Sequence, residues 1–226
     1  MKALKYHGGV PKEDIQKENL EALEEGIHNL LRHIDNIRNK FGLNVIVAIN
    51  KYIDDTESEI NMLKTKLEEL KIPLSLVEAW GKGGVGAKDL ATKVVEICEK
   101  EDNLKYIYNL EDSIQTKVEK IAKDIYGAEG VEYSEVAIEE IKRIEKLGYG
   151  NLPVCIAKTQ YSFSDDPKNL LCKEPFKIHI SEVNLRAGAG FVVILTGKIF
   201  TMPGLPKIPS AEFIDINENG EIVGIF

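Results

Sequence analysis

A glycine-rich stretch, Gly81-Lys-Gly-Gly-Val-Gly86, follows a predicted strand and precedes a predicted helix. Glycines at such a place let backbone N–H groups surround an anion at the start of the helix. The first and last of these glycines have the spacing of the phosphate-loop pattern GxxxxGK[ST], but Ala87 then precedes Lys88, and Asp89 replaces the magnesium-binding hydroxyl. The pattern disfavours a nucleotide-hydrolysing loop and leaves two interpretations open, a tight strand-to-helix turn and a ligand-lining loop.

A second polar segment, Asn50-Lys51-Tyr52-Ile53-Asp54, follows another predicted strand. It is similar to the NKxD base-recognition signature of GTPases, except that the aspartate comes one residue late. Open α/β sheets bind ligands at the carboxyl ends of their parallel strands, and Asn50 and Lys51 would lie there.

Two aromatic residues would stand beside these polar groups. Tyr52 lies just past the end of the first predicted strand, and Trp80, the only tryptophan, ends the second. If the two strands are neighbours, both rings occupy one edge of the sheet and could sandwich a flat heterocycle, each stack contributing roughly 0.5–1.5 kcal/mol. The alternative is that Trp80 packs beneath the adjacent loop.

The remaining polar segments carry weaker signals. The stretch from Lys158 to Pro167 follows a predicted strand and is either a binding loop or a turn whose hydroxyls satisfy one another. Arg186–Gly190 and Met202–Pro206 are predicted to be architectural turns. The four histidines show no metal-ligand spacing, and neither a nucleophile elbow nor a Cys–His pair is visible, so we predict no metal site.

The elements that would position these residues alternate between helix and strand. Apolar spacing predicts a long helix over 13–40, and a β-branched run predicts a strand over 44–50. A capping box at Thr56 and Glu59 starts the next helix, which is followed by a strand over 73–80 and a helix carrying Leu90, Val94 and Ile97. Such alternation implies parallel strands with crossover helices. Because no strand precedes the first helix, we expect a partial doubly wound parallel sheet, the back half of a larger P-loop-like domain.

After a charged linker at 99–103 the pattern changes to α+β. Helices are expected over 110–125 and after Ser134, strands over 152–157, 176–183, 190–196 and 213–216, and a hairpin at Asn219-Gly220. We therefore predict an α/β segment with the ligand pocket at 1–102 and a smaller α+β domain at 103–226.

Composition excludes several classes of protein. The 226 residues are 43% hydrophobic and 29% charged, which is typical of a folded chain rather than a disordered one. A net charge of −8 argues against nonspecific nucleic-acid binding. No apolar run has spanning length and no signal sequence is visible, so we expect a soluble, cytoplasmic protein without membrane contact. Cys98, Cys155 and Cys172 form no CxxC motif and are expected to be buried in a reducing compartment.

Several longer motifs carry a family resemblance. The chain resembles the C-terminal portion of formate–tetrahydrofolate ligase almost from end to end. The matching stretches include Ala3–Gly9, Asn19–Leu23, Arg32–Ile34, Val47–Lys51 with Asp55-Thr56, Trp80–Gly84, Ile125–Ala128, Gly148–Ser162, Gly188–Phe191 and Thr201–Lys207.

This resemblance implies an ATP-dependent ligase of one-carbon metabolism. Formate is phosphorylated by ATP to formyl phosphate, and N10 of tetrahydrofolate then attacks it to give 10-formyltetrahydrofolate. Family members need Mg²⁺ with the nucleotide, respond to a monovalent cation and form homotetramers. Carried over by position, Tyr52, usually phenylalanine in the family, and Trp80 would flank the flat pterin or base. The expected substrate-binding set also contains Asn50, Lys51, Lys82, Gly83 and Gly84, and no residue is assigned a catalytic role.

The departure from the family is an absent N-terminal region. Family enzymes are considerably longer, and that region holds the phosphate loop and most groups that handle formate and the phosphoryl group. We therefore expect ATP and Mg²⁺ to be bound mainly by the missing half, supplied by a partner chain, and the isolated chain to be inactive. The start at Met1, close to the motif at Ala3, favours a separately encoded piece. The alternative is a non-catalytic folate-binding or assembly module.

Overall fold

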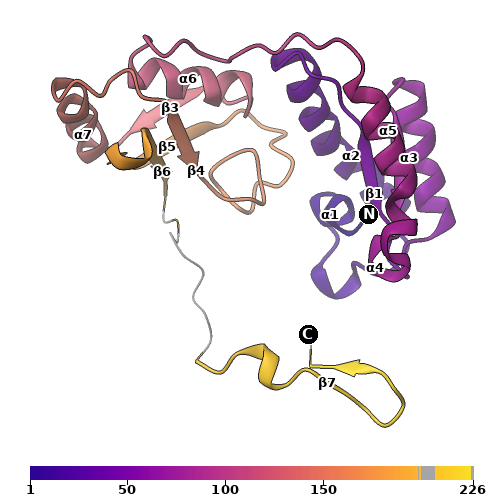
Figure 1. Ribbon diagram of the computed structural model, residues 1–226. Helices are drawn as coiled ribbons and strands as arrows, with labels where there is room; N and C mark the ends of the chain where they lie inside the picture. The colour runs from indigo at the N-terminus through magenta and orange to yellow at the C-terminus, as the bar shows by residue number, and fades with distance from the viewer. Residues whose placement is uncertain (198, 200–206, 225–226) are drawn as a thin grey trace.

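The computed structural model describes residues 1–197, 199 and 207–224, and most of its elements form two groups, each around its own hydrophobic core (Figure 1). The first group contains α1 (Lys2–His7), α2 (Leu20–Asp35, continued by a π-helical turn over Asn36–Lys40), β1 (Val47–Asn50), α3 (Glu57–Glu69), β2 (Leu74–Val77), α4 (Ala79–Lys82) and α5 (Lys88–Cys98). The second contains α6 (Ile114–Asp124), β3 (Gly130–Tyr133), α7 (Glu135–Lys146), β4 (Val154–Ala157), β5 (Lys177–Arg186) and β6 (Phe191–Thr196).

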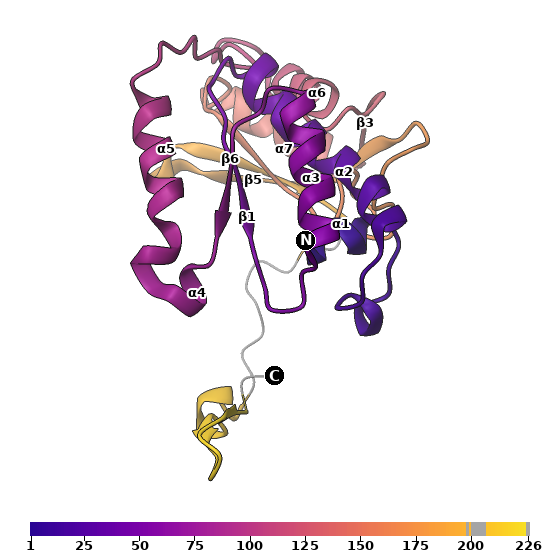
Figure 2. The same ribbon diagram turned by 90° about the vertical axis from the view of Figure 1, so that its right-hand side faces the viewer.

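The first group is built around one pair of parallel strands. β1 pairs with β2 in a register that places Asn50 beside Val77, which confirms the predicted parallel arrangement. Val47 and Ile49 of β1 pack against apolar residues of α2 and α3. Figure 2 shows β1 running between α3 and α5. The predicted apolar stripe of α5 is only partly covered, since no residue of this helix is buried.

Local capping explains where two of these helices begin. The predicted helix over 13–40 starts only at Leu20, because the Asn19 side chain accepts a hydrogen bond from the Ala22 N–H at 2.9 Å and so caps the helix there. The capping box of Thr56 and Glu59 at the start of α3 is confirmed.

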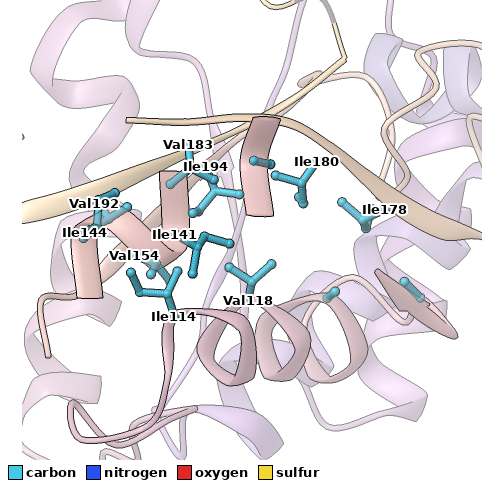
Figure 3. Packing of buried hydrophobic residues seen from close by; sticks show 13 residues of the cluster. Ile114, Val118, Ile141, Ile144, Val154, Ile178, Ile180, Val183, Val192 and Ile194 are labelled. Atoms are coloured by element: carbon cyan, nitrogen blue, oxygen red, sulfur yellow. The ribbon is translucent and has the colours of Figure 1, made fainter. Parts of the chain in front are cut away.

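The second group is a mixed four-stranded sheet in the order β3-β5-β6-β4. β3 is parallel to β5 and β4 to β6, while β5 and β6 are antiparallel. Figure 3 shows how residues of α6 and α7 meet those of the sheet in one core, among them Val118, Ile141, Ile180 and Ile194. The α+β prediction for this part is confirmed. Further along, β7 (Asp215–Ile216) and β8 (Ile222–Val223) form the predicted hairpin around Asn219-Gly220.

Helix α2 joins the two groups through side-chain amides. Asn29 Nδ2 donates to the Leu170 carbonyl at 2.8 Å, and Asn36 Nδ2 donates to the Ile125 carbonyl at 2.9 Å. Both asparagines are buried, so these bonds hold loops of the second group against the first.

The described ranges contain neither a membrane-spanning helix nor a metal-binding cluster. No helix there is long and apolar enough to cross a membrane, and no cluster of three His, Cys, Asp or Glu side chains could hold a metal ion. The prediction of buried cysteines is wrong: Cys98 and Cys155 are exposed and Cys172 is half-buried, because each lies on the open side of its element or in a loop. The motif Met202–Pro206 lies outside the described residues.

Candidate functional site

The carboxyl ends of β1 and β2 meet at one edge of the parallel pair. The Lys51 N–H donates to the Val77 carbonyl at 2.9 Å, so the strands remain joined up to that edge. Tyr52 follows β1 directly. Trp80 does not end β2 as predicted, because the strand stops at Val77 and Trp80 lies in the short helix α4. The helical turn nevertheless keeps Trp80 at the same edge.

The two aromatic rings face each other. The ring centroids of Tyr52 and Trp80 lie 6.4 Å apart and the ring planes differ by 19°. Trp80 is 64% exposed and Tyr52 is 42% exposed, so Trp80 does not pack beneath the adjacent loop. Large aromatic faces left open to solvent at a strand edge are available to a ligand.

Backbone and side-chain hydrogen bonds fix the orientation of these rings. The indole Nε1–H of Trp80 donates to the Lys51 carbonyl at 2.9 Å. Asn50 Nδ2 donates to the Tyr52 hydroxyl at 3.2 Å, and the Tyr52 N–H donates to Asp55 at 2.8 Å. Each ring is therefore held by the polypeptide of β1 and the turn that follows it.

The rings line a pocket of about 330 Å³. That volume falls at the lower end of the roughly 300–1,000 Å³ typical of small-molecule sites. Of the predicted residues, Lys51, Tyr52, Trp80 and Lys82 line it, and Asn50 contributes through its bond to Tyr52. The substrate-binding set expected from the sequence omits three lining residues, Ile53, Glu78 and Gly81.

Two ion pairs flank the pocket. Lys51 Nζ lies 3.0 Å from Glu57, and this hydrogen bond raises the pKa of Lys51. Lys82 Nζ lies 2.6 Å from Glu78, and the hydrogen bond from Lys82 lowers the pKa of the Glu78 carboxyl. Both shifts favour the charged forms of Lys51 and Glu78 at neutral pH. The four-residue spacing of Glu78 and Lys82 was the signal that could have identified Glu78 from the sequence.

The glycine-rich stretch combines a tight turn with open space. The Glu78 N–H donates to the Gly86 carbonyl at 3.0 Å, and a Cβ at Gly86 would lie 2.5 Å from the Glu78 carbonyl oxygen. Gly86 is thus required by a close backbone approach, as the turn interpretation predicts. Apart from the adjacent residues, no described atom lies within 4 Å of a Cβ at Gly83 or Gly84. These two glycines come directly after Lys82 in the chain but do not line the pocket.

The two aspartates that depart from the phosphate-loop and NKxD patterns, Asp89 and Asp54, interact with other residues of the chain. Asp89 accepts hydrogen bonds from Ser75 at 2.6 Å and Lys93 at 2.8 Å, which turns it towards β2 and α5. Asp54 forms an ion pair with Lys2 at 3.4 Å. The described residues at this edge therefore do not fit the phosphates and Mg²⁺ of a nucleotide.

The loop after β4 satisfies much of its own polarity. Lys158 Nζ donates to the carbonyls of Thr159, at 2.8 Å, and of Ser162. The hydroxyls of Ser162 and Ser164 lie 2.9 Å apart. These bonds agree with the interpretation of this loop as a turn whose hydroxyls satisfy one another.

Comparison with known proteins accounts for the chain as a whole. The family model described as "Formate--tetrahydrofolate ligase" matches residues 1–226. A formate–tetrahydrofolate ligase from Symbiobacterium thermophilum is 48% identical over 226 residues, which is all of this chain but only 41% of the relative. The chain thus spans less than half the length of the curated relative that it matches. From the match along its full length, we conclude that the chain belongs to the formate–tetrahydrofolate ligase family.

Proposed function

We propose that the chain is the folate-side portion of a formate–tetrahydrofolate ligase and that a flat pterin or base binds between Tyr52 and Trp80. The observation that carries this proposal is the pair of open, nearly parallel rings with centroids 6.4 Å apart. A planar ligand between two faces needs about 7 Å, two contacts of roughly 3.5 Å each. The centroid separation of 6.4 Å is of that order.

The residues around the rings have supporting roles. Asn50 and the Lys51 carbonyl hold the two rings through the hydrogen bonds described above. The ammonium groups of Lys51 and Lys82 border the pocket, and each is paired with a glutamate but can donate a further hydrogen bond to a polar group of the ligand. Gly83 and Gly84 leave open space beside it. Tyrosine in place of the family's usual phenylalanine keeps the stacking face.

The reaction of the complete enzyme would combine this pocket with a phosphate loop. ATP phosphorylates formate to formyl phosphate. N10 of tetrahydrofolate then attacks the formyl carbon, and phosphate leaves as 10-formyltetrahydrofolate forms. The residues at the edge of the β1–β2 pair do not fit the nucleotide phosphates, so the proposed part of this edge is to bind and orient the folate.

The part of the relatives that this match does not cover would supply the rest. We infer that residues 1–102 form the back half of a doubly wound P-loop-like domain and that residues 103–226 form the smaller second domain. The two-stranded parallel sheet and the partly covered α5 support this inference, as does the 41% share of the relative. ATP, Mg²⁺ and a monovalent cation would bind mainly to the partner portion, and the assembly would be a homo-oligomer as in the family.

A reconstitution assay tests the proposal. The chain is mixed with ATP, Mg²⁺, formate and tetrahydrofolate, with and without a polypeptide that corresponds to the N-terminal part of the family, and 10-formyltetrahydrofolate is measured. We expect product only when both polypeptides are present, and less of it with Trp80→Ala. Turnover by the isolated chain would show that no partner is needed.

The alternative is a non-catalytic folate-binding or assembly module. The open Tyr52–Trp80 pocket on a chain without a phosphate loop is the observation that favours it. Folate binding by the chain together with no turnover in the presence of the N-terminal polypeptide would select this alternative.

A further inference from the structure

A second pocket lies between the two groups of elements and is lined by residues of both. It has a volume of about 240 Å³ and is formed by α1 and α2 on one side and by the loop after β4 on the other. Its walls include His7, His33, Tyr126, Lys158 and Tyr161. It shares no lining residue with the Tyr52–Trp80 pocket, and none of its lining residues carries a carboxylate.

The charge around this pocket is positive and lacks direct compensation. Within the described ranges, neither Lys158 nor the adjacent Arg32 has a carboxylate within 4 Å. Lys158 lies over the Tyr126 ring at 5.1 Å, and the Arg32 guanidinium lies over the Phe163 ring at 5.0 Å. A local positive cluster of this kind stands out in a chain whose net charge is −8.

One buried hydrogen-bonding atom in the same pocket has no partner among the described residues. His7 Nδ1 is buried and has no hydrogen-bond partner among the described residues. The His33 ring packs against Phe163 with centroids 4.7 Å apart. A buried ring nitrogen without a hydrogen-bond partner is unfavourable, so such a site needs an explanation.

We propose that this pocket, the His7–His33 pocket, binds a small oxyanion of the carboxylate or phosphate class. Two imidazoles can donate to the oxygen atoms, while Lys158 and Arg32 attract the charge. The volume lies below the roughly 300–1,000 Å³ of sites for drug-sized ligands, which favours a compact anion over a whole folate or nucleotide. The inference does not depend on the proposed function, because the two pockets have separate walls.

Binding should be linked to protonation of the histidines. Burial first, and then the charge of His33, lowers the pKa of His7. Burial, and then the charges of Lys158 and Arg32, lowers the pKa of His33. An anion favours the protonated rings, so affinity should increase as the pH falls below about 6.5. The other titratable groups near Lys158 are the Cys172 thiol, the Tyr126 and Tyr161 phenols, and Asp165, which accepts a hydrogen bond from His179 at 2.9 Å.

Histidine NMR of the full chain tests the proposal. The chain contains four histidines, and the exposed His28 and His179 lie outside the pocket and serve as internal controls. Sodium formate and inorganic phosphate are titrated separately at pH 6, with sodium chloride as the ionic-strength control. We expect the ring signals of His7 and His33 to shift saturably, and their apparent pKa values to rise, with formate, phosphate or both. The more tightly bound probe identifies the source of the oxyanion.

The variants His7→Gln and His33→Gln provide the second readout. Each should weaken binding by about tenfold or more, because a charge-assisted hydrogen bond is lost, whereas His28→Gln should bind as the wild type does. Equal, non-saturating shifts of all four histidines would overturn the proposal, since they would report ionic strength alone. So would unchanged affinity in both pocket variants. If a variant does not fold, the wild-type titration decides.

Discussion

The indole nitrogen of Trp80 donates a hydrogen bond to the backbone carbonyl of Lys51 at 2.9 Å, which ties α4 to the end of β1. This bond orients the Trp80 ring, which is more exposed than the Tyr52 ring, without burying it. The ring is therefore already in place before a ligand arrives, and less conformational entropy is lost on binding than for a freely rotating side chain.

Substitution of Tyr52 should separate the ring from its hydroxyl. Tyr52→Phe keeps the stacking face and should leave the affinity for tetrahydrofolate within about twofold of the wild type. Tyr52→Ala removes one stack worth roughly 0.5–1.5 kcal/mol and should weaken binding by about 2- to 13-fold. Isothermal titration calorimetry on the purified chain measures both. Tyr106→Ala, which removes an 84% exposed ring elsewhere, is the control and should have no effect. Equal losses in Tyr52→Phe and Tyr52→Ala would contradict stacking.

Two alanine substitutions in the glycine-rich stretch should behave oppositely. At Gly86 the added Cβ would meet the Glu78 carbonyl oxygen at 2.5 Å, so Gly86→Ala should shift the turn, destabilise the chain by about 1–3 kcal/mol and disturb the pocket. Gly84→Ala adds a Cβ into open space and should change stability by less than about 0.5 kcal/mol. Urea denaturation measures both. Equal destabilisation would show that the turn is not built as described.

The buried ion pair between α1 and α3 should be essential for stability. Lys5 Nζ lies 2.9 Å from Glu59, and both side chains are almost completely buried. Lys5→Met leaves the Glu59 charge without its partner and should reduce the free energy of unfolding by about 3–5 kcal/mol. Lys17→Met, which removes an exposed pair with Asp14, should leave the free energy of unfolding almost unchanged. Similar losses in the two variants would mean that the Lys5–Glu59 pair is not buried in solution.

Stability should fall in weak acid because of His7 and His33. Both have pKa values lowered by burial in the folded chain, whereas the unfolded chain binds these protons near pH 6.5. The unfolded state therefore takes up more protons as the pH decreases, and stability that is complete above pH 6.5 is lost towards the folded pKa values. The urea midpoint should decrease between pH 7.5 and 5.5 and should decrease less in the double variant His7→Gln/His33→Gln. An identical decrease in wild type and variant would assign the effect to other groups.

Local patterns predicted much of the fold, and a turn that the pattern did not reveal decides where the second strand ends. The β-branched run before Asn50 and the capping box at Thr56 are signals within a few residues, and both correspond to observed elements. The strand predicted over 73–80 extends three residues beyond the observed end of β2 at Val77. The turn closed by Glu78 and Gly86 begins a helix there instead.

The candidate site was predictable in part for the same reason. Parallel strands bring the residues after their carboxyl ends together, so the proximity of Tyr52 and Trp80 followed from topology. The burial of His7 against a loop more than 150 residues later depends on the docking of α2 through Asn29 and Asn36. No periodicity in the sequence records such a contact, and the second pocket was therefore not predicted.

The most direct test of the central claim is a tetrahydrofolate titration of the wild-type chain, followed by the fluorescence of its only tryptophan, Trp80. The account predicts a saturable change in emission that exceeds the inner-filter loss seen with free N-acetyltryptophanamide and that becomes weaker in Tyr52→Ala. Emission that follows the inner-filter control at every concentration would show that no folate ring binds against Trp80 and would contradict the account.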